Sequence, residues 1–252
     1  MSALSKILGF ILLLVVGVLF SCSSNKNKQL EEPKHQAEEI YIKHFAYSLV
    51  YNEQMEQASW VAYNLESKEL QKNYKRKNNF RVDTMVHSQT ANNADYSKSG
   101  YDRGHLAAAA DMTWNKQAMS ESFYYSNMSP QRPGFNRGIW KRLESKVRRI
   151  AVKYENVYVC VGPIFKDSIT TIGANKVAVP SHYYKALLIY NDTLQQSIAY
   201  VMPNKKSSDP ISSFAISVDS LEQILDMDLF HSLPNKQEVD IENKFDINYW
   251  LE

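Results

Sequence analysis

Two stretches rich in aromatic and β-branched residues, residues 45–51 and 59–65, lie on either side of a short polar segment. Such runs around a polar turn are typical of an antiparallel strand pair. The same composition recurs in three later stretches, residues 157–161, 183–190 and 197–202. The pattern therefore predicts a β-sheet that draws its strands from both halves of the chain.

Helical patterns separate these strands. Helices are predicted over residues 120–125, 136–154 and 218–225, and the last of these has Asp219 and Glu222 in its first turn. Strand pairs interleaved with a few helices favour an α+β fold, a single mixed domain around an antiparallel sheet, over a doubly wound parallel sheet. A glycine-rich phosphate loop of either familiar spacing is absent from the sequence.

The N-terminus carries an apolar run, residues 7–20, preceded by Lys6. The run is shorter than the roughly 20 residues of a membrane-spanning helix and matches the apolar core of a signal peptide. Leu19-Phe20-Ser21-Cys22 resembles the lipobox of bacterial lipoproteins. That resemblance implies a signal peptide over residues 1–21, cleavage before Cys22 and lipid on the Cys22 thiol. An ordinary signal peptide with an incidental cysteine remains the alternative.

Residues 22–42 are polar and charged and show no hydrophobic periodicity, so we expect a solvated linker between the lipid and a folded domain at residues 43–252. The expected location is exported and membrane-anchored through Cys22, facing the periplasm or the cell surface. Cys160, the other cysteine, is expected to act as a small buried hydrophobic residue in a strand.

The formal net charge of +2 shows that the chain as a whole is not strongly basic. Binding to nucleic acid would therefore need a local concentration of Lys and Arg. The sixteen tyrosines are better explained as residues that fill strand faces than as a base-stacking platform. No pair of histidines has the spacing of a zinc site, and His35, His44, His87, His182 and His231 receive no role.

The candidate chemistry is concentrated between residues 101 and 144. His105 can accept a proton near neutral pH. On a helix that begins near Asn136, the side chains of Asn136, Trp140 and Glu144 fall on one face, where an amide oxygen and a carboxylate could approach a hydrated metal. The same pattern also describes an ordinary amphipathic helix with Trp140 in the core and a basic outer face. Periodicity alone does not make Asn136 functional.

Three segments in this window, Tyr101-Asp102-Arg103-Gly104-His105-Leu106, Ser126-Asn127-Met128-Ser129-Pro130-Gln131 and residues 135–144, resemble the DNA/RNA non-specific endonucleases. These are ββα-metal (His-Me finger) nucleases, which include secreted bacterial nucleases and endonuclease G. The likeness extends over nearly the whole domain, because further segments match family landmarks in the same order, at residues 60–65, 161–165, 179–185, 202–204 and 218–222.

The resemblance implies that His105 is the general base and that Asn136 is the one direct protein ligand of a divalent metal, Mg²⁺ or alternatively Mn²⁺ or another such cation. One or two protein ligands suit Mg²⁺, which usually keeps several waters. The resemblance also implies that Asn127 orients the imidazole through a hydrogen bond and that Glu144 positions metal-bound water. The products would carry a 5′ phosphate and a 3′ hydroxyl.

Arginines complete the implied site. Arg103 belongs to the histidine motif, although for Asp102 and Arg103 a salt bridge that holds the loop is as plausible as direct catalysis. The family also carries an arginine that stabilises transition-state charge, and Arg76 is favoured for this role over Lys77 or Arg81. The alanine run that begins at Ala107 stands where the family usually has a proline, and this change removes no chemical group.

The sequence therefore predicts a metal-dependent hydrolase that cleaves DNA and RNA with little sequence preference, because contacts to phosphates and sugars carry no direct sequence information. Two alternatives remain: a nucleic-acid-binding lipoprotein without turnover, and a phosphodiesterase that acts on another substrate, such as a nucleotide-linked cell-wall component. The presence of His105, Asn136 and Glu144 together argues against the first of these. The oligomeric state is left open.

Overall fold

The computed structural model describes residues 29–250 except residues 89 and 167. The predicted signal peptide and Cys22 lie outside the described residues. Within the described part of the chain, no helix has the length and apolar character needed to cross a bilayer.

A seven-stranded sheet forms the centre of the molecule, and each pair of neighbouring strands is antiparallel. In spatial order its strands are β1 (Ile40–Lys43), β2 (Ser48–Asn52), β3 (Gln57–Glu66), β6 (Asn156–Ile164), β9 (His182–Tyr190), β10 (Gln195–Pro203) and β11 (Ala215–Ile216). The α+β class and the antiparallel sheet predicted from the sequence are confirmed. The predicted strand at residues 45–51 begins only at Ser48, because residues 44–47 form the turn that follows β1.

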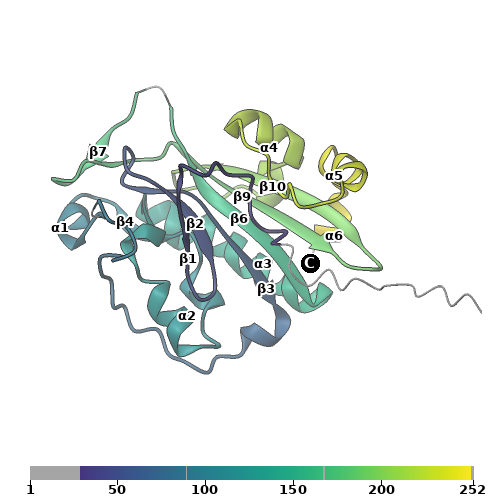
Figure 1. Ribbon diagram of the computed structural model, residues 1–252, viewed down its shortest axis with the longest axis horizontal. Coiled ribbons are helices and arrows are strands. Elements are labelled where there is room, and N and C mark those ends of the chain that lie inside the picture. Colours follow the sequence, from purple (N-terminus) through teal and green to yellow (C-terminus); the bar gives the residue numbers. More distant parts are fainter. Residues whose placement is uncertain (1–28, 89, 167, 251–252) are drawn as a thin grey trace, which may run out of the picture.

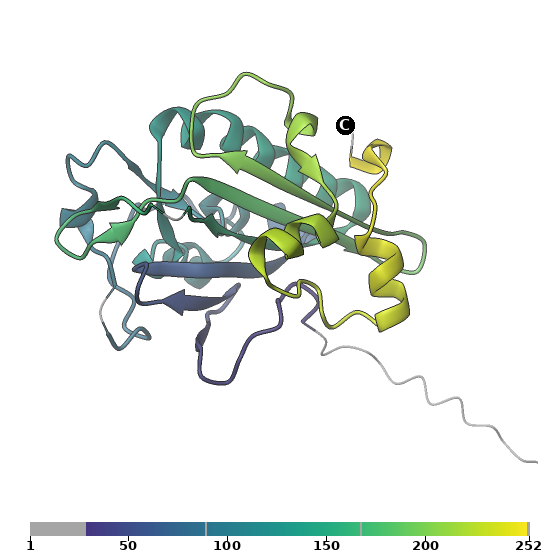
Figure 2. The same ribbon diagram turned by 90° about the horizontal axis from the view of Figure 1, so that it is seen from above.

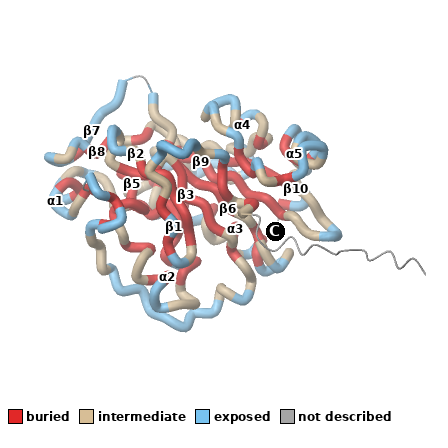
Figure 3. Tube along the Cα trace, viewed as in Figure 1, coloured by how far each residue is buried: buried red, intermediate tan, exposed pale blue. Residues whose placement is uncertain are grey.

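Helices cover both faces of this sheet (Figures 1 and 2). The long helix α3 (Lys141–Tyr154) packs on one face through Leu143, Val147 and Ile150. On the opposite face lie α4 (Val218–Leu225), which contributes Val218 and Leu221, and α5 (Asn235–Glu242). Strand residues alternate between the two hydrophobic clusters, as a sheet buried on both sides requires. Figure 3 shows the resulting buried centre.

Several short elements lie outside the main sheet and its covering helices. They are the helices α1 (Asn93–Tyr96), α2 (Lys116–Glu121) and α6 (Ile247–Trp250), the 3₁₀ turns η1 (Ser67–Leu70), η2 (Ala109–Asp111), η3 (Tyr125–Asn127) and η5 (Ile211–Phe214), and the strand pair β7 (Thr171–Ile172) and β8 (Val177–Ala178). The helix predicted at residues 120–125 lies earlier, since α2 ends at Glu121. The helix predicted at residues 218–225 is confirmed as α4.

The folded part begins before residue 43, where the sequence analysis placed its start. Residues 40–43 form β1, which pairs with β2. Upstream of β1, Leu30 and Glu32 are buried, and Glu32 accepts hydrogen bonds from Tyr41 and Ser48. The prediction of a solvated linker up to residue 42 is therefore wrong for residues 30–42. The segment is polar, and residues such as Gln36 and Glu38 are exposed, but the buried Glu32 bonds to the first strands.

Two further strands lead into α3. Strand β4 (Asp102–His105) pairs antiparallel with β5 (Met128–Gln131), with His105 opposite Met128. A side chain at Gly104 would clash with that of Gln131, which explains the glycine before the histidine. After β5 the chain forms a π-helical turn, η4 (Phe135–Trp140), and enters α3. This is a ββα arrangement.

The helix predicted over residues 136–154 is not regular from its start. Gly138 has φ −104° and ψ −111°, so the helical path is interrupted there and regular α-helix begins at Lys141. Trp140 is fully buried against Phe135 and Tyr183, which anchors the turn. Asn136 is thereby held on a separate turn rather than on the same regular helix as Glu144.

Candidate active site

A polar groove runs along β4, η4 and the start of α3. It consists of two adjoining cavities of about 630 and 430 Å³. Both cavities have in their walls Arg76, Arg103, Asn136 and Arg137. The smaller cavity also contains His105 and Glu144. The structure thus brings together five of the six residues singled out from the sequence, while Asn127 does not line the groove.

His105 closes one wall of the smaller cavity. Its side chain is only 8% exposed and packs edge-on against Phe123, with a ring-centroid distance of 5.0 Å, and against Phe80 at 5.8 Å. Within the described chain its Nε2 atom has no hydrogen-bond partner. Burial, followed by the charges of Arg76 and Arg103, lowers the pKa of His105 to about 3. The imidazole is therefore neutral at pH 7, with one nitrogen available as an acceptor.

Arg76→Ala is expected to raise the pKa of His105, because the substitution removes a positive charge that opposes protonation. Burial remains, so the pKa should stay below its ordinary value near 6.5. NMR titration of the histidine rings in metal-free protein measures the shift. Lys205→Ala is the matched control: Lys205 acts on His182, so the pKa of His182 should rise and that of His105 should not. An unchanged His105 titration in Arg76→Ala would contradict the assignment.

Asn136 is oriented by an acidic neighbour. Its Nδ2 donates to Asp102 Oδ2 at 2.9 Å, which leaves the carbonyl oxygen Oδ1 for another ligand. Arg137 binds the same carboxylate through two hydrogen bonds, at 2.6 and 2.9 Å. Asp102 therefore forms a salt bridge, but with Arg137 and not with Arg103, which donates to Asn93. In addition, Asp102 holds the amide of Asn136.

Glu144 lies near a buried group of charged residues beneath the groove. Burial raises the pKa of Glu144 to about 7, Lys185 opposes this rise and Asp111 adds to it. Lys185 is fully buried on β9, where its Nζ lies 5.0 Å from the centre of the Trp140 ring. Asp111 accepts hydrogen bonds from Arg148 at 2.7 Å and from Tyr63 at 2.9 Å. A positive charge at Lys185 therefore favours the ionised form of Glu144.

The predicted hydrogen bond from Asn127 to the imidazole is wrong. Asn127 is fully buried, and its amide binds the backbone of Ala107, two residues after His105, and of Ser122. Oδ1 accepts from Ala107 N at 2.8 Å, while Nδ2 donates to Ala107 O at 3.0 Å and to Ser122 O at 2.9 Å. Asn127 therefore positions His105 through the main chain that follows it. These bonding partners could not be read from the sequence.

Asn127→Ala is expected to destabilise the protein by about 3 kcal/mol or more, because three buried backbone groups lose their partners at roughly 1–3 kcal/mol each. The melting temperature should fall by about 6–12 °C. Thermal unfolding followed by circular dichroism measures this. Asn73→Ala, at an exposed position with one long hydrogen bond, is the control and should change stability by less than about 0.5 kcal/mol. Equal melting temperatures for the two variants would refute the positioning role.

Arg76 and Arg103 face the groove while Arg81 does not. Arg103 stacks over Phe80 at 4.0 Å and donates to Asn93 at 2.6 Å, and Arg76 lies 4.9 Å from the ring centre of Phe123. Arg81 instead donates to Ser120 O at 2.6 Å. Arg76, the arginine favoured from the sequence, therefore lines the groove, and Arg81 does not.

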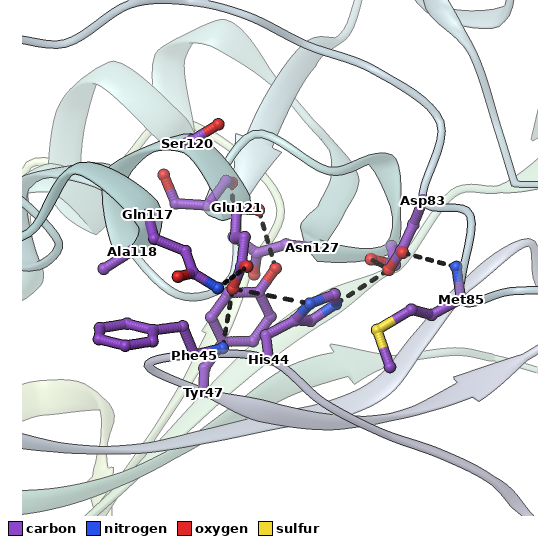
Figure 4. A network of polar contacts seen from close by, with 12 residues as sticks. His44, Phe45, Tyr47, Asp83, Met85, Gln117, Ala118, Ser120, Glu121 and Asn127 are labelled. Atoms are coloured by element: carbon purple, nitrogen blue, oxygen red, sulfur yellow. Dashed lines mark hydrogen bonds and ion pairs between the residues drawn. The ribbon is translucent and has the colours of Figure 1, made fainter.

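A buried polar network holds the loop around Asp83 and the end of α2 against the turn between β1 and β2 (Figure 4). His44 Nε2 lies 2.9 Å from Asp83 Oδ2, and Ser126 Oγ donates to the same oxygen at 2.6 Å. Burial opposes the ionisation of Asp83, but these hydrogen bonds outweigh it and its pKa is lowered. Glu121 accepts from Phe45 N at 2.8 Å on the other side of the imidazole. His44, which received no role from the sequence, thus joins three distant segments.

Comparisons with known proteins agree with this geometry. The sequence profile of the family described as DNA/RNA non-specific endonuclease matches residues 24–236. The chain belongs to this family. Human mitochondrial endonuclease G is 38% identical over 193 residues, which are 71% of this chain and 65% of that protein. Nuclease C1 of Cunninghamella echinulata var. echinulata is 33% identical over 77% of this chain and 83% of its own.

A solved structure of the EndoG/EndoGI complex, concerned with the mechanism of EndoG inhibition, superimposes with a TM-score of 0.75 at 36% identity. The match covers 82% of this chain and 92% of the solved one. By contrast, this chain spans about two thirds of the length of mammalian endonuclease G, 65% of the human and 64% of the bovine protein. The ββα arrangement expected from the resemblance is thereby confirmed.

Members of the DNA/RNA non-specific endonuclease family depend in general on a divalent metal, and the donor set of the groove suits one. The oriented Asn136 oxygen and the Glu144 carboxylate are the oxygen ligands that Mg²⁺ and Ca²⁺ prefer. One amide ligand with a carboxylate farther along the groove leaves room for several waters, as Mg²⁺ requires. The residues therefore fit a hydrated metal held mainly through Asn136.

The family motifs did not identify every residue that shapes this endonuclease-like site. Lys185 lies within an otherwise apolar strand sequence, Tyr183 to Tyr190, and a lone lysine in such a run is an unusual signal. Its position under Glu144 is set by the pairing of β9 with β6 and could not be inferred from that signal. Phe80 and Phe123, which surround His105, come from separate loops and gave no signal.

Proposed function

We propose that the protein is an endonuclease that hydrolyses phosphodiester bonds of DNA and RNA with little sequence preference. The observation that carries the proposal is the neutral imidazole of His105, which lies in the wall of an arginine-lined groove together with the oriented Asn136. A proton acceptor, a metal-ligand oxygen and cations for a phosphate are thus present in one cavity.

The charge of the groove supports a nucleic-acid substrate. Its walls include five basic side chains, Arg76, Arg103, Arg137, Lys141 and Arg148. Although the whole chain has a net charge of only +2, this local concentration supplies the phosphate contacts that dominate nucleic-acid affinity. Such contacts bind the backbone of any sequence, which agrees with low specificity.

In the proposed reaction a water molecule attacks phosphorus while the neutral imidazole of His105 accepts its proton. A new P–O bond forms, and the bond from phosphorus to the 3′ oxygen breaks. The products are a 5′ phosphate and a 3′ hydroxyl, the latter after protonation from solvent. Arg76 and Arg103 are placed to bind the non-bridging oxygens. The phosphate also offsets the two positive charges that lower the pKa of His105, so substrate binding makes the imidazole a stronger base.

Mg²⁺, or Mn²⁺ in its place, is the proposed metal, held by Asn136 with Glu144 orienting its water shell. Such an ion supplies charge neutralisation at the phosphate and at the leaving oxygen. Asp102 keeps the Asn136 oxygen directed into the groove. Burial lowers the pKa of Lys185, and the positive charge of this lysine in its protonated form favours the ionised form of Glu144.

Purified protein incubated with plasmid DNA and with structured RNA, with Mg²⁺ or with chelator, tests the proposal. We expect both polymers to be cut internally in Mg²⁺ and left intact in chelator. Binding of both polymers without cleavage would identify a non-catalytic binding protein instead. Cleavage of a small phosphodiester alone would identify a phosphodiesterase with another substrate.

We also propose that the protein is an exported lipoprotein, anchored to a membrane through lipid on Cys22. The apolar run and the lipobox-like Leu19-Phe20-Ser21-Cys22 support this proposal. Metabolic labelling with a palmitate analogue should mark the wild type and leave Cys22→Ala unlabelled. Protease treatment of intact cells distinguishes a surface from a periplasmic location. Equal labelling of both variants would refute lipidation at Cys22.

A further inference from the structure

Three carboxylates converge on the side of the sheet opposite the catalytic groove. Asp219 and Glu222 lie one turn apart on α4, and Glu242 is the last residue of α5. One oxygen from each of the three carboxylates lies within 4.8 Å of the others. The two helices lie side by side over the sheet, away from α3 (Figures 1 and 2). We call this group the α4–α5 acidic cluster.

Glu242 distinguishes this cluster from ordinary surface acidity. Its side chain is only 2% exposed, and no hydrogen bond reaches its Oε1 from any part of the chain that the structure describes. A buried carboxylate oxygen without a donor is costly, so such oxygens normally bind a proton donor or a metal. Burial, and then the charges of Glu222, Glu238, Asp219 and Asp228, raises the pKa of Glu242 to about 9. The neighbouring charges that act on it are all negative.

Glu222 is fixed in a geometry that suits a shared ligand. Its Oε1 accepts a hydrogen bond from Leu229 N at 2.6 Å, which ties the carboxylate to the loop between α4 and α5. One oxygen of the Glu222 carboxylate lies within 4.8 Å of an oxygen from each of the other two acids. The cluster therefore combines a pre-oriented carboxylate, an unpartnered buried one and a half-exposed one at the opening, Asp219.

We propose that Asp219, Glu222 and Glu242 form a second divalent-cation site, separate from the catalytic groove, that takes Ca²⁺ and clamps α4 to α5. Three carboxylates and no imidazole or thiolate select a hard cation. Ca²⁺ accepts six to eight oxygens in flexible geometry, whereas Mg²⁺ prefers few protein ligands and most of its waters. The cation would satisfy Glu242 Oε1 and neutralise the mutual repulsion of the three acids. It would stabilise the fold rather than take part in phosphodiester hydrolysis.

Thermal unfolding of purified, chelator-treated protein over a CaCl₂ titration tests the site, with calorimetric counting of bound Ca²⁺. We expect the melting temperature of the wild type to rise by about 5 °C or more at saturating Ca²⁺. Glu242→Gln should lose this rise. Asp240→Asn, an exposed acid on the same helix, is the matched control and should keep it. Should Glu242→Gln fail to fold, Asp219→Asn provides the same test at a half-exposed position.

Asn136→Ala separates the two candidate metal sites, because it removes the ligand in the catalytic groove and should keep the Ca²⁺-dependent rise in melting temperature. If Asn136→Ala loses the Ca²⁺-dependent rise in melting temperature and Glu242→Gln keeps it, the cation binds in the groove. That result would overturn the proposal. A wild type that neither binds Ca²⁺ at the cluster nor gains stability from it would show instead that two carboxyl groups share a proton there. That outcome also overturns the proposal, and none of these results depends on nuclease activity.

Discussion

His105→Ala is expected to reduce kcat for plasmid cleavage by about 10²–10⁴-fold, the usual contribution of a general base. KM should change little, because the arginines that bind phosphate remain in the groove. Initial rates of supercoil relaxation in Mg²⁺ over a range of DNA concentrations separate the two constants. The structural reason is the neutral ring of His105, which lines the groove and is held between Phe80 and Phe123.

His87→Ala is the matched control for this experiment, since His87 is exposed and does not line the groove. It should retain the wild-type kcat. Circular dichroism checks that His105→Ala remains folded, because the substitution leaves a cavity beside two aromatic rings. Imidazole added to the buffer should restore part of the activity if the missing group is a proton acceptor. A folded His105→Ala protein with wild-type kcat would remove the proposed mechanism.

The low pKa of His105 also makes folding stability depend on pH. The folded protein resists protonation of this ring down to about pH 3, whereas an unfolded chain takes up the proton near pH 6.5. The unfolded state thus binds more protons between these values, so the contribution of His105 favours folding above about pH 6.5. That contribution is lost as the pH falls, by up to about 1.4 kcal/mol per pH unit for this one group.

Local sequence patterns predicted the elements whose neighbours are close in the chain. The apolar and aromatic runs of β9 and β10 and the helical pattern of α4 depend on residues within a few positions of one another, and all three elements appear where expected. The limits of the folded part were harder to predict. Residues 30–42 look like a linker because they are polar, yet Glu32 is satisfied by Tyr41 and Ser48, which a local pattern cannot show.

The site residues show the same contrast between what local sequence predicts and what only the fold reveals. The order of motifs placed His105, Asn136 and Glu144 in one cavity, since β4, β5 and α3 form a compact local unit. The atoms that each residue binds depended on chain segments far away in the sequence. Asn127 faces the backbone of Ala107 instead of the imidazole, and Lys185 reaches Glu144 only because β9 lies in the middle of the sheet. Residue identity was therefore predictable, whereas bonding partners required the fold.

Asn136→Ala is expected to lower kcat/KM by about 10²-fold or more, because it removes the oxygen proposed to hold the metal beside the scissile bond. The Mg²⁺ concentration required for half-maximal activity should rise at the same time. Activity measured against Mg²⁺ concentration resolves both effects. Asn235→Ala, an exposed asparagine on α5, is the control and should match the wild type.

Asp102→Ala tests the same proposed metal ligand as Asn136→Ala, with a smaller expected effect. It keeps the Asn136 amide but removes the carboxylate that holds Nδ2 at 2.9 Å, and it releases Arg137. A misoriented ligand still binds part of the time, so the loss should be smaller than in Asn136→Ala, about 10–100-fold, and excess Mg²⁺ should partly restore activity. Because Asp102 acts only through Asn136 in this scheme, adding Asp102→Ala to Asn136→Ala should cause little further loss. Fully multiplicative losses in the double variant would show instead that Asp102 has a role independent of the metal ligand.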